Sequence, residues 1–165
     1  MHAENAHKFA PVVFGVRGQG PGIRGQGSGV GDQRSGNQMK SNIKSYQDLE
    51  VWHKAMDLVV MCYQMTTNFP KTEVYGLSSQ LQRAAVSVPA NIAEGRQRQH
   101  SKEFLQHLSI AYGSLAELET HIQIAGRLNY IYENQINKML GITAEIGKML
   151  NGLRRSIEKR SYPEP

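Results

Sequence analysis

The stretch QLQRAAVSVPANIAEG, residues 80–95, decides the fold of this chain. Its apolar and small residues recur at helical spacing: Leu81, Ala84, Val88, Ile92 and Gly95. Pro89 lies inside that stripe, where a proline removes one backbone hydrogen bond at a cost of about 3 kcal/mol. A chain keeps such a residue where neighbouring helices hold the segment in place. The stretch therefore indicates one helix of a packed bundle, bent one turn before NIAEG.

Charge and cysteine content narrow the class of protein. The 165 residues suffice for one domain and a tail. Residues 1–44 carry six Lys/Arg and two Asp/Glu, whereas residues 45–165 carry 13 and 12, so the high isoelectric point is not by itself a sign of nucleic-acid binding. Cys62 is the only cysteine, and we expect a buried, inert thiol in a cytoplasmic protein. No run approaches the roughly 20 apolar residues of a membrane span, and no signal peptide is recognisable.

Residues 1–44 form a separate Gly/Arg-rich segment, in which GVRGQGP (15–21) is repeated as GIRGQGS (22–28). Such a segment cannot bury enough apolar area to offset its ordering entropy, so we expect a disordered arm. Two interpretations stay open. The arm is an RGG-like RNA-binding segment, or it is not native coding sequence, because Met39 with the following KSNIKSYQDLEVW reads as a natural protein start. We expect residues 1–38 to be dispensable for folding.

From residue 45 a helical period continues almost to the end and predicts four helices. The first spans about 48–68 with Asp48 as its N-cap, and the second begins at about 72–77 and ends at 97. The third begins at Ser101, turns at 126–129, and is followed by the fourth from about Glu133. The expected buried faces are Leu49, Trp52, Met56, Val59 and Tyr63 on the first helix; Phe104, Leu108, Ala111, Leu115, Leu118, Ile122 and Ala125 on the third; and Ile136, Met139, Thr143, Ile146, Leu150, Leu153 and Ile157 on the fourth.

These helices and their short connections predict an all-α fold. We expect an antiparallel up-down-up-down four-helix bundle over residues 45–160, followed by a tail at 161–165. Some apolar or aromatic residues lie outside the main seams, and exposed apolar patches commonly mark interfaces. These residues are Val51, Val60, Leu105, Tyr112 and Ile124.

Four segments carry a resemblance to a known family: residues 46–58, 69–95, 101–131 and 148–157. In order and spacing they resemble the four-helix bundle proteins encoded in 23S rRNA intervening sequences. The resemblance covers about residues 44–159. It implies a ring-shaped homopentamer and the same fold as the accessory protein of diversity-generating retroelements, a basic pentamer that works with a reverse transcriptase and nucleic acid. It implies no enzymatic activity and supplies no catalytic residue.

Enzyme chemistry finds little support in the sequence. A ferritin-like di-metal bundle needs Glu-x-x-His on two helices, and only Glu50 with His53 fits in the bundle. His100, Glu103 and His107 share one helical face, which we interpret as a solvated polar surface. No nucleophile elbow or phosphate loop is present. We therefore predict no catalytic residue, no metal site, no cofactor and no small-molecule substrate.

The NIAEG motif is interpreted as structural. Asn91 follows Pro89 closely and could satisfy the carbonyl freed near Ala85, and Glu94 could pair with Arg98 at i,i+4. A ligand or subunit contact is the alternative for both residues. The structural assignment comprises Pro89, Asn91, Glu94 and Gly95.

An up-down-up-down topology places the start of the first helix, the connection between the second and third, and the end of the fourth at one end of the bundle. Basic residues collect there, and a solvated cap is the plain interpretation. In a ring every subunit presents this end to the same face, which would make a multivalent surface for RNA or DNA that contacts phosphates without a base code. The candidate nucleic-acid-binding residues are Lys54, Arg96, Arg98, Lys102, Arg154, Arg155, Lys159 and Arg160.

Three functions follow in order. The first is a non-enzymatic oligomeric bundle, with a pentamer expected, that binds RNA or a ribonucleoprotein partner through the basic end. The second is a protein–protein adaptor without nucleic-acid binding. The third is a ferritin-like metal enzyme. No membrane partner is expected.

Overall fold

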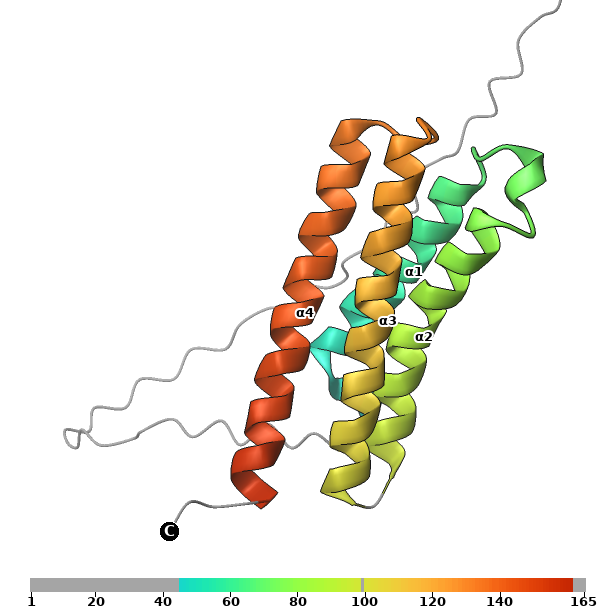
Figure 1. The fold of residues 1–165 in the computed structure, drawn as a ribbon. Helices are drawn as coiled ribbons and strands as arrows, with labels where there is room; N and C mark the ends of the chain where they lie inside the picture. The colour runs from blue at the N-terminus through green and yellow to red at the C-terminus, as the bar shows by residue number, and fades with distance from the viewer. Residues whose placement is uncertain (1–44, 99, 162–165) are drawn as a thin grey trace, which may run out of the picture. The chain divides into compact units, whose positions relative to one another are not determined.

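The computed structural model describes residues 45–98 and 100–161. Four α-helices account for most of them: α1 (Glu50–Thr66), α2 (Leu77–Gln97), α3 (Ser101–Arg127) and α4 (Glu133–Ser161). Two short 3-10 helices, η1 (Tyr46–Asp48) and η2 (Lys71–Glu73), precede α1 and α2. The predicted all-α bundle is confirmed (Figure 1). The predicted arm at 1–44 and residues 162–165 lie outside the described residues.

Contacts between the helices establish their relative directions. Ser87 and Asn91 on α2 bond Ser114 and His107 on α3, so a step forward along α2 is a step back along α3. On α4, Gly147 lies against Tyr112 of α3, and Ile136 lies against Gly126. These two pairs give α3 and α4 opposite directions as well. Figure 1 shows successive helices running in opposite directions, and α1 packs on both α2 and α4.

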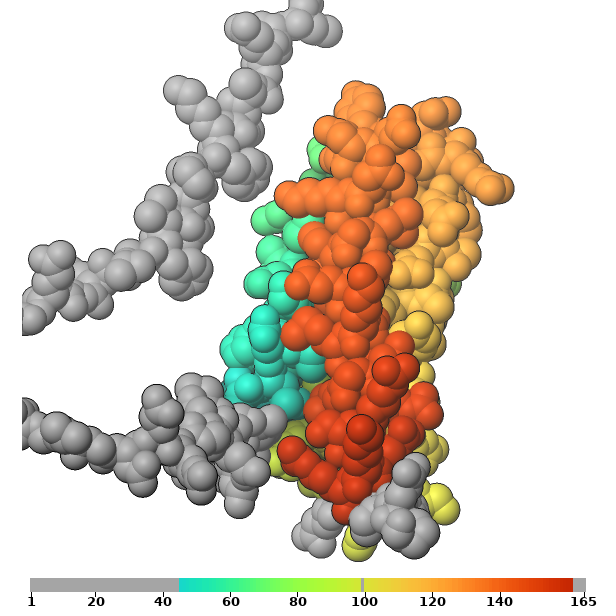
Figure 2. Space-filling view, turned by 90° about the vertical axis from the view of Figure 1, so that its left-hand side faces the viewer, coloured from blue at the N-terminus to red at the C-terminus, as the bar shows by residue number. Residues whose placement is uncertain are grey.

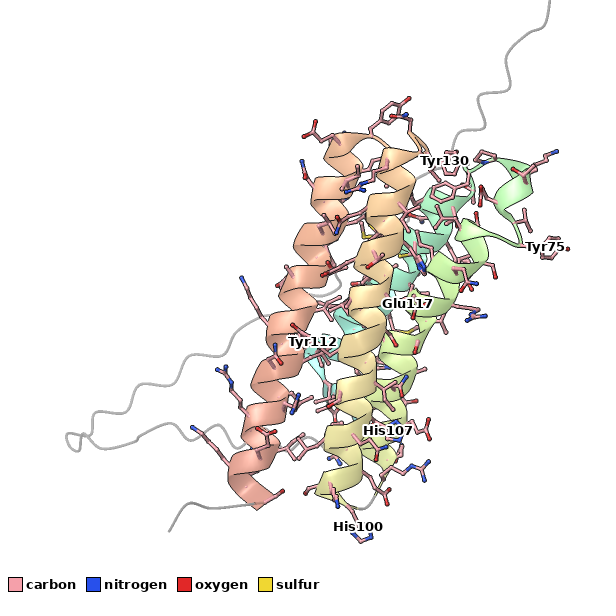
Figure 3. All side chains as sticks on the ribbon, in the orientation of Figure 1. Tyr75, His100, His107, Tyr112, Glu117 and Tyr130 are labelled. Atoms are coloured by element: carbon pink, nitrogen blue, oxygen red, sulfur yellow. The ribbon has the colours of Figure 1, made fainter. Side chains whose placement is uncertain are left out.

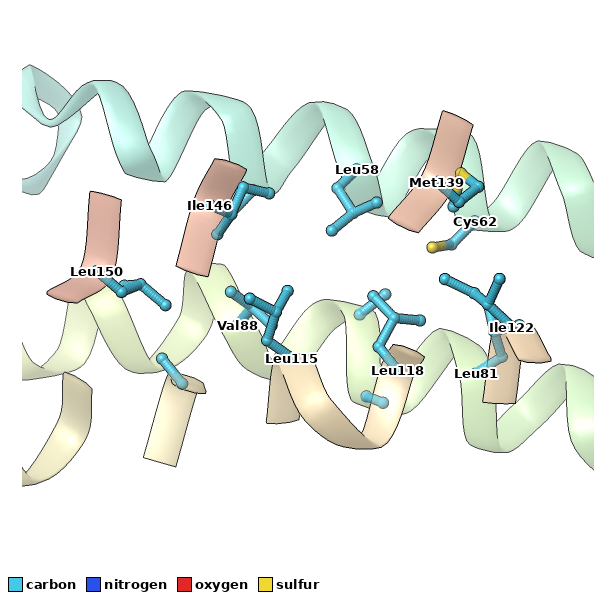
Figure 4. Packing of buried hydrophobic residues seen from close by; sticks show 14 of the residues in the cluster. Leu58, Cys62, Leu81, Val88, Leu115, Leu118, Ile122, Met139, Ile146 and Leu150 are labelled. Carbon is cyan, nitrogen blue, oxygen red and sulfur yellow. The ribbon is translucent and has the colours of Figure 1, made fainter. Parts of the chain in front are cut away.

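The core is made of the apolar stripes of all four helices (Figure 4). On α2 and α3 every residue of the predicted stripes is buried. On α4 the stripe is buried in the middle, from Met139 to Leu150, whereas Ile136, Leu153 and Ile157 are half-buried near the two ends. The strict helical period of these three stripes explains why sequence alone located them.

The predicted buried face of α1 is wrong in part. Leu49 is buried and Trp52 and Val59 are half-buried, but Met56 and Tyr63 are 40% and 47% exposed. The residues of α1 that point into the core are Val51, Ala55, Leu58, Cys62 and Met65. Val51, predicted to lie outside the seams, is thus a core residue. Because α1 carries apolar residues around most of its circumference, its period does not indicate a unique buried face.

Helix ends differ from prediction by one or two residues. Asp48 does not cap α1: it belongs to η1, where its carboxylate accepts from the Ser45 backbone N–H at 2.8 Å in a capping box. Leu49 is the N-cap of α1. Ser101 is the first residue of α3, after His100, and makes no side-chain cap.

Helix α3 ends in a Schellman motif. The N–H groups of Asn129 and Tyr130 donate to the carbonyls of Gly126 and Ala125 at 3.0 and 2.9 Å. Asn129 has φ 57°, a left-handed conformation that asparagine tolerates better than most residues. The turn therefore lies at Leu128–Asn129, and Gly126 still belongs to the helix.

Helix α2 continues through Pro89, which is buried. The carbonyl of Ala85 was the expected partner of Asn91, but the Asn91 side chain instead donates to the carbonyl of Ser87 at 2.8 Å. The prediction is corrected because the amide reaches back one turn along its own helix face, four residues, and Ala85 lies six residues back. Within the described residues, no helix has both the length and the apolar character needed to cross a membrane.

Candidate functional site

The last turns of α2, the first turn of α3 and the last turns of α4 meet at one end of the bundle (Figure 1). Figure 2 looks onto α4 and shows its C-terminal turns beside the first turns of α3. We call residues 94–98, 101–103 and 154–160 the basic end. Its described residues include seven cations and three carboxylates. The cations are Arg96, Arg98, Lys102, Arg154, Arg155, Lys159 and Arg160.

Lys54, the eighth candidate, does not join this group. Its ammonium lies 2.8 Å from the Glu145 carboxylate near the middle of α4. Glu145 precedes Arg154 by nine residues, or about 13 Å of helical rise. The hydrogen bond to Glu145 raises the pKa of Lys54. The side chain therefore bridges α1 and α4 along the flank of the bundle.

Some cations of the basic end are engaged by neighbouring carboxylates. Arg98 donates to Glu94 at 2.6 Å, and its Nε lies 4.0 Å from Glu103. The hydrogen bond to Glu94 raises the pKa of Arg98, and the hydrogen bond from Arg98 lowers the pKa of Glu94. Arg154 pairs with Glu158 at 3.5 Å. The predicted Glu94–Arg98 pair is thus confirmed.

Four other cations are exposed and form no ion pair within residues 45–98 and 100–161. They are Lys102, Arg155, Lys159 and Arg160. Part of this charge has an ordinary structural use, because Lys159 and Arg160 lie in the last turn of α4, where cations complement the helix dipole. Lys102 lies in the first turn of α3, where the dipole does not favour a cation, so the dipole does not account for the whole cluster.

The NIAEG motif builds a polar network between α2 and α3 just above the basic end. Asn91 donates to the Ser87 hydroxyl at 3.1 Å, and Ser87 shares a hydrogen bond of 2.8 Å with Ser114. His107 Nδ1 lies 3.1 Å from Asn91 Oδ1, and His107 Nε2 lies 3.7 Å from Glu94 Oε1. The network connects the buried Ser114 to the exposed Arg98.

Gly95 is the reason His107 comes so close to α2. A Cβ at position 95 would lie 2.5 Å from His107 Cβ and 2.9 Å from Phe104 Cδ2. His107 was missed as a partner of Asn91 and Glu94, since sequence indicates neighbours on one helix and not the register between two. The available signal was a small residue, Gly95, in an otherwise apolar stripe.

The residues considered as metal ligands are used differently. His107 bonds across to α2, and Glu103 faces Arg98. His53 Nε2 lies 2.7 Å from the carbonyl oxygen of Gln47. Among the described residues, no three His, Cys, Asp or Glu side chains gather in a way that could hold a metal ion.

Two further surfaces are hydrophobic or concave. Met56, Val60 and Tyr63 are exposed at i, i+4 and i+7 on α1. Gln82 of α2 bonds Thr66 of α1 at 2.7 Å, so exposed Val86, one turn after Gln82, lies on the same flank of the bundle. We call these four residues the α1–α2 apolar face. A groove of about 300 Å³ lies between α3 and α4 and is lined by Tyr112, Leu115, Ala116, Glu119, Thr143, Ala144, Gly147, Lys148 and Asn151.

Comparison with known proteins finds a matching family and a similar solved structure. Residues 47–152 match the family described as 23S rRNA-intervening sequence protein. A solved structure of a protein of unknown function, from the S23 ribosomal protein family of Bacteroides thetaiotaomicron, is 27% identical with a TM-score of 0.58, and the alignment covers 63% of this chain and 97% of that chain. No curated protein matches. The family match ends before the four cations of α4.

Proposed function

The chain belongs to the family of 23S rRNA-intervening sequence proteins, and from that premise we propose that it is a non-enzymatic, oligomeric helical bundle that binds RNA or a ribonucleoprotein through its basic end. The observation that carries the proposal is the gathering of seven cations from three helices at one end, four of them without an ion pair in the described residues. Side chains brought together from α2, α3 and α4 present a surface, which a single basic helix does not.

The chemistry of this surface suits phosphate. Lysine and arginine side chains that extend into solvent release counterions when they neutralise phosphates, and this term is independent of sequence. Arginine can also bind a phosphate with two parallel hydrogen bonds. The basic end offers two arginines without an ion pair in the described part of the chain, Arg155 and Arg160, beside Lys102 and Lys159. We therefore propose sequence-tolerant binding to the nucleic-acid backbone.

Oligomerisation would strengthen this weak surface. We propose a homo-oligomer, with the pentamer that the family resemblance implies as the expected state. The α1–α2 apolar face supports association, because contiguous exposed apolar side chains commonly mark interfaces. In a cyclic assembly every copy presents the basic end to the same side, so several weak sites act together on one strand.

The α1–α2 apolar face also favours a second candidate function, a protein–protein adaptor without nucleic-acid binding. Here a different protein covers Met56, Val60, Tyr63 and Val86, and the charges at the basic end serve only solubility and the helix dipoles. The two candidates differ in whether removing charge from the basic end changes RNA affinity.

The test compares two double variants of the full chain that lose the same charge at opposite ends of the bundle. Arg155→Gln with Lys159→Gln changes the basic end, and Lys71→Gln with Lys138→Gln changes exposed cations elsewhere. Fluorescence anisotropy with a mixed-sequence single-stranded RNA at about 50 mM salt, where phosphate contacts are strong, measures affinity. We expect the first variant to bind at least severalfold more weakly than the second. Equal affinities would favour the adaptor.

A further inference from the structure

One carboxylate oxygen at the basic end faces two cationic partners. Glu94 Oε1 accepts from Arg98 Nη2 at 2.6 Å and lies 3.7 Å from His107 Nε2. Arg98 and Glu94 are about half exposed, whereas the His107 side chain is 17% exposed. Figure 3 shows His107 on α3, above His100 at the lower end. Any change in the charge of His107 therefore acts on the acceptor that holds Arg98.

Hydrogen-bond chemistry assigns the proton on one side of the ring. The Asn91 amide nitrogen donates to the carbonyl and hydroxyl oxygens of Ser87 at 2.8 and 3.1 Å, so Asn91 Oδ1 is free to accept. His107 Nδ1, 3.1 Å from Oδ1, must then carry a hydrogen. In the neutral ring Nε2 consequently holds a lone pair that faces the carboxylate. A second proton converts Nε2 into a donor to the same oxygen that Arg98 uses.

The ring is held in this position from both sides. Gly95 leaves room for His107 against α2, and a Cβ there would lie 2.5 Å from the His107 Cβ. The other charged groups of the cluster are Arg98 on α2 and Glu103 on α3, one turn before His107 and 4.0 Å from Arg98 Nε. Because Glu103 is farther from Arg98 than Glu94 is, Glu94 makes the stronger contact.

We propose that His107 is a proton-controlled switch that determines whether Arg98 is held by Glu94 or is available to a phosphate group. Histidine is the side chain that ordinarily changes charge between pH 5 and 8. With His107 neutral, Glu94 binds Arg98. With His107 protonated, Glu94 is shared between two cations, and Arg98 can turn toward a phosphate beside Lys102. The role of the switch in nucleic-acid binding rests on the proposed function.

The first readout needs no nucleic acid. In the ¹⁵N-labelled full chain, NMR follows the Arg98 guanidinium signals, assigned with Arg98→Lys, and the His107 ring from pH 5.5 to 8. We expect both residues to titrate with one common midpoint. His107→Gln keeps a donor for Asn91 and should abolish the Arg98 response, whereas His100→Gln, which removes an exposed histidine at the same end, should leave it. Arg98 signals that ignore the titration of His107 overturn the switch.

The second readout is the affinity for a mixed-sequence single-stranded RNA at pH 6 and pH 8. We expect the ratio of the two affinities to be about two- to fivefold larger in the wild type and His100→Gln than in His107→Gln, the scale of one exposed charge pair. Glu94→Gln frees Arg98 at both pH values, so it should bind more tightly at pH 8 and lose the difference. If Glu94→Gln keeps the wild-type pH dependence, the switch is refuted. A chain that binds no RNA at either pH, while Arg98 still follows His107, overturns the proposed function and the nucleic-acid role of the switch together.

Discussion

Replacing Gly95 by alanine should destabilise the bundle, although alanine is the better residue for a helix. In an exposed helix interior the substitution stabilises by about 1 kcal/mol. At position 95 the new Cβ would lie 2.5 Å from His107 Cβ and 2.9 Å from Phe104 Cδ2. Ordinary contact between carbon atoms is about 3.5–4.0 Å. Helices α2 and α3 must therefore separate by an appreciable fraction of an ångström.

The net magnitude is the difference between these terms. Overpacking a close contact costs about 1–3 kcal/mol. Moving His107 away from Asn91, now 3.1 Å away, loses about 1 kcal/mol more from a part-buried hydrogen bond. After subtracting the gain in helix propensity, we expect Gly95→Ala to lower the free energy of unfolding by about 1–3 kcal/mol. Gly113→Ala is the matched control, because no atom lies within 4 Å of its added Cβ.

The assay is urea unfolding followed by far-UV circular dichroism, at one fixed protein concentration since association changes apparent stability. Gly113→Ala should raise the free energy of unfolding by up to about 1 kcal/mol, and Gly95→Ala should lower it. If both alanine variants are stabilised equally, the close approach of α2 and α3 at Gly95 is wrong. The network through His107 would lose its geometric basis with it.

Other predictions concern groups away from the basic end. Burial raises the pKa of Cys62 from 9.0 to about 12, so native thiol labelling at pH 8 should be about a thousandfold slower than for an ordinary thiol, and rapid labelling would contradict its burial. Because the folded thiol keeps its proton longer than the unfolded one, the free energy of unfolding should fall as pH rises from about 9 to about 12. Asn129→Gly should stabilise by up to about 1 kcal/mol in thermal unfolding, and Asn129→Val should destabilise, because φ is 57° there; no difference between the two would refute the left-handed turn. Burial, and next the hydrogen bond to Glu73, raise the pKa of Tyr130 above 10.0, so Tyr130→Phe should lose less stability than the wild type as pH rises above about 10.

The period of the sequence predicted three helices well and the first one poorly. On α2 and α3 a single apolar stripe faces polar residues, so only one side can be buried. On α1 the apolar residues surround the helix, and the choice between Met56 and Leu58 for the core depends on where α2 and α4 lie. That information belongs to the tertiary structure and is absent from the local pattern.

The candidate site divides in the same way. Topology brought Arg98, Lys102 and Arg155 to one end, because short connections fix which helix ends are neighbours. Lys54 was misplaced because α1 begins at Glu50, above the basic end in Figure 1, and its ammonium reaches Glu145. The contact between His107 and Glu94 depends on the register of α2 against α3, which Gly95 permits and which sequence does not display.

The salt dependence of RNA binding tests the central claim most directly. The logarithm of the association constant is plotted against the logarithm of salt concentration for the full chain and for a variant with Lys102, Arg155, Lys159 and Arg160 changed to glutamine. The arm is present in both proteins, so its contribution cancels in the comparison. The account predicts a shallower slope in the variant, by about 0.7 for each phosphate of single-stranded RNA that the variant no longer neutralises, or about 3 if all four side chains bind phosphates. Identical slopes for the two proteins would contradict a phosphate-binding role for the basic end.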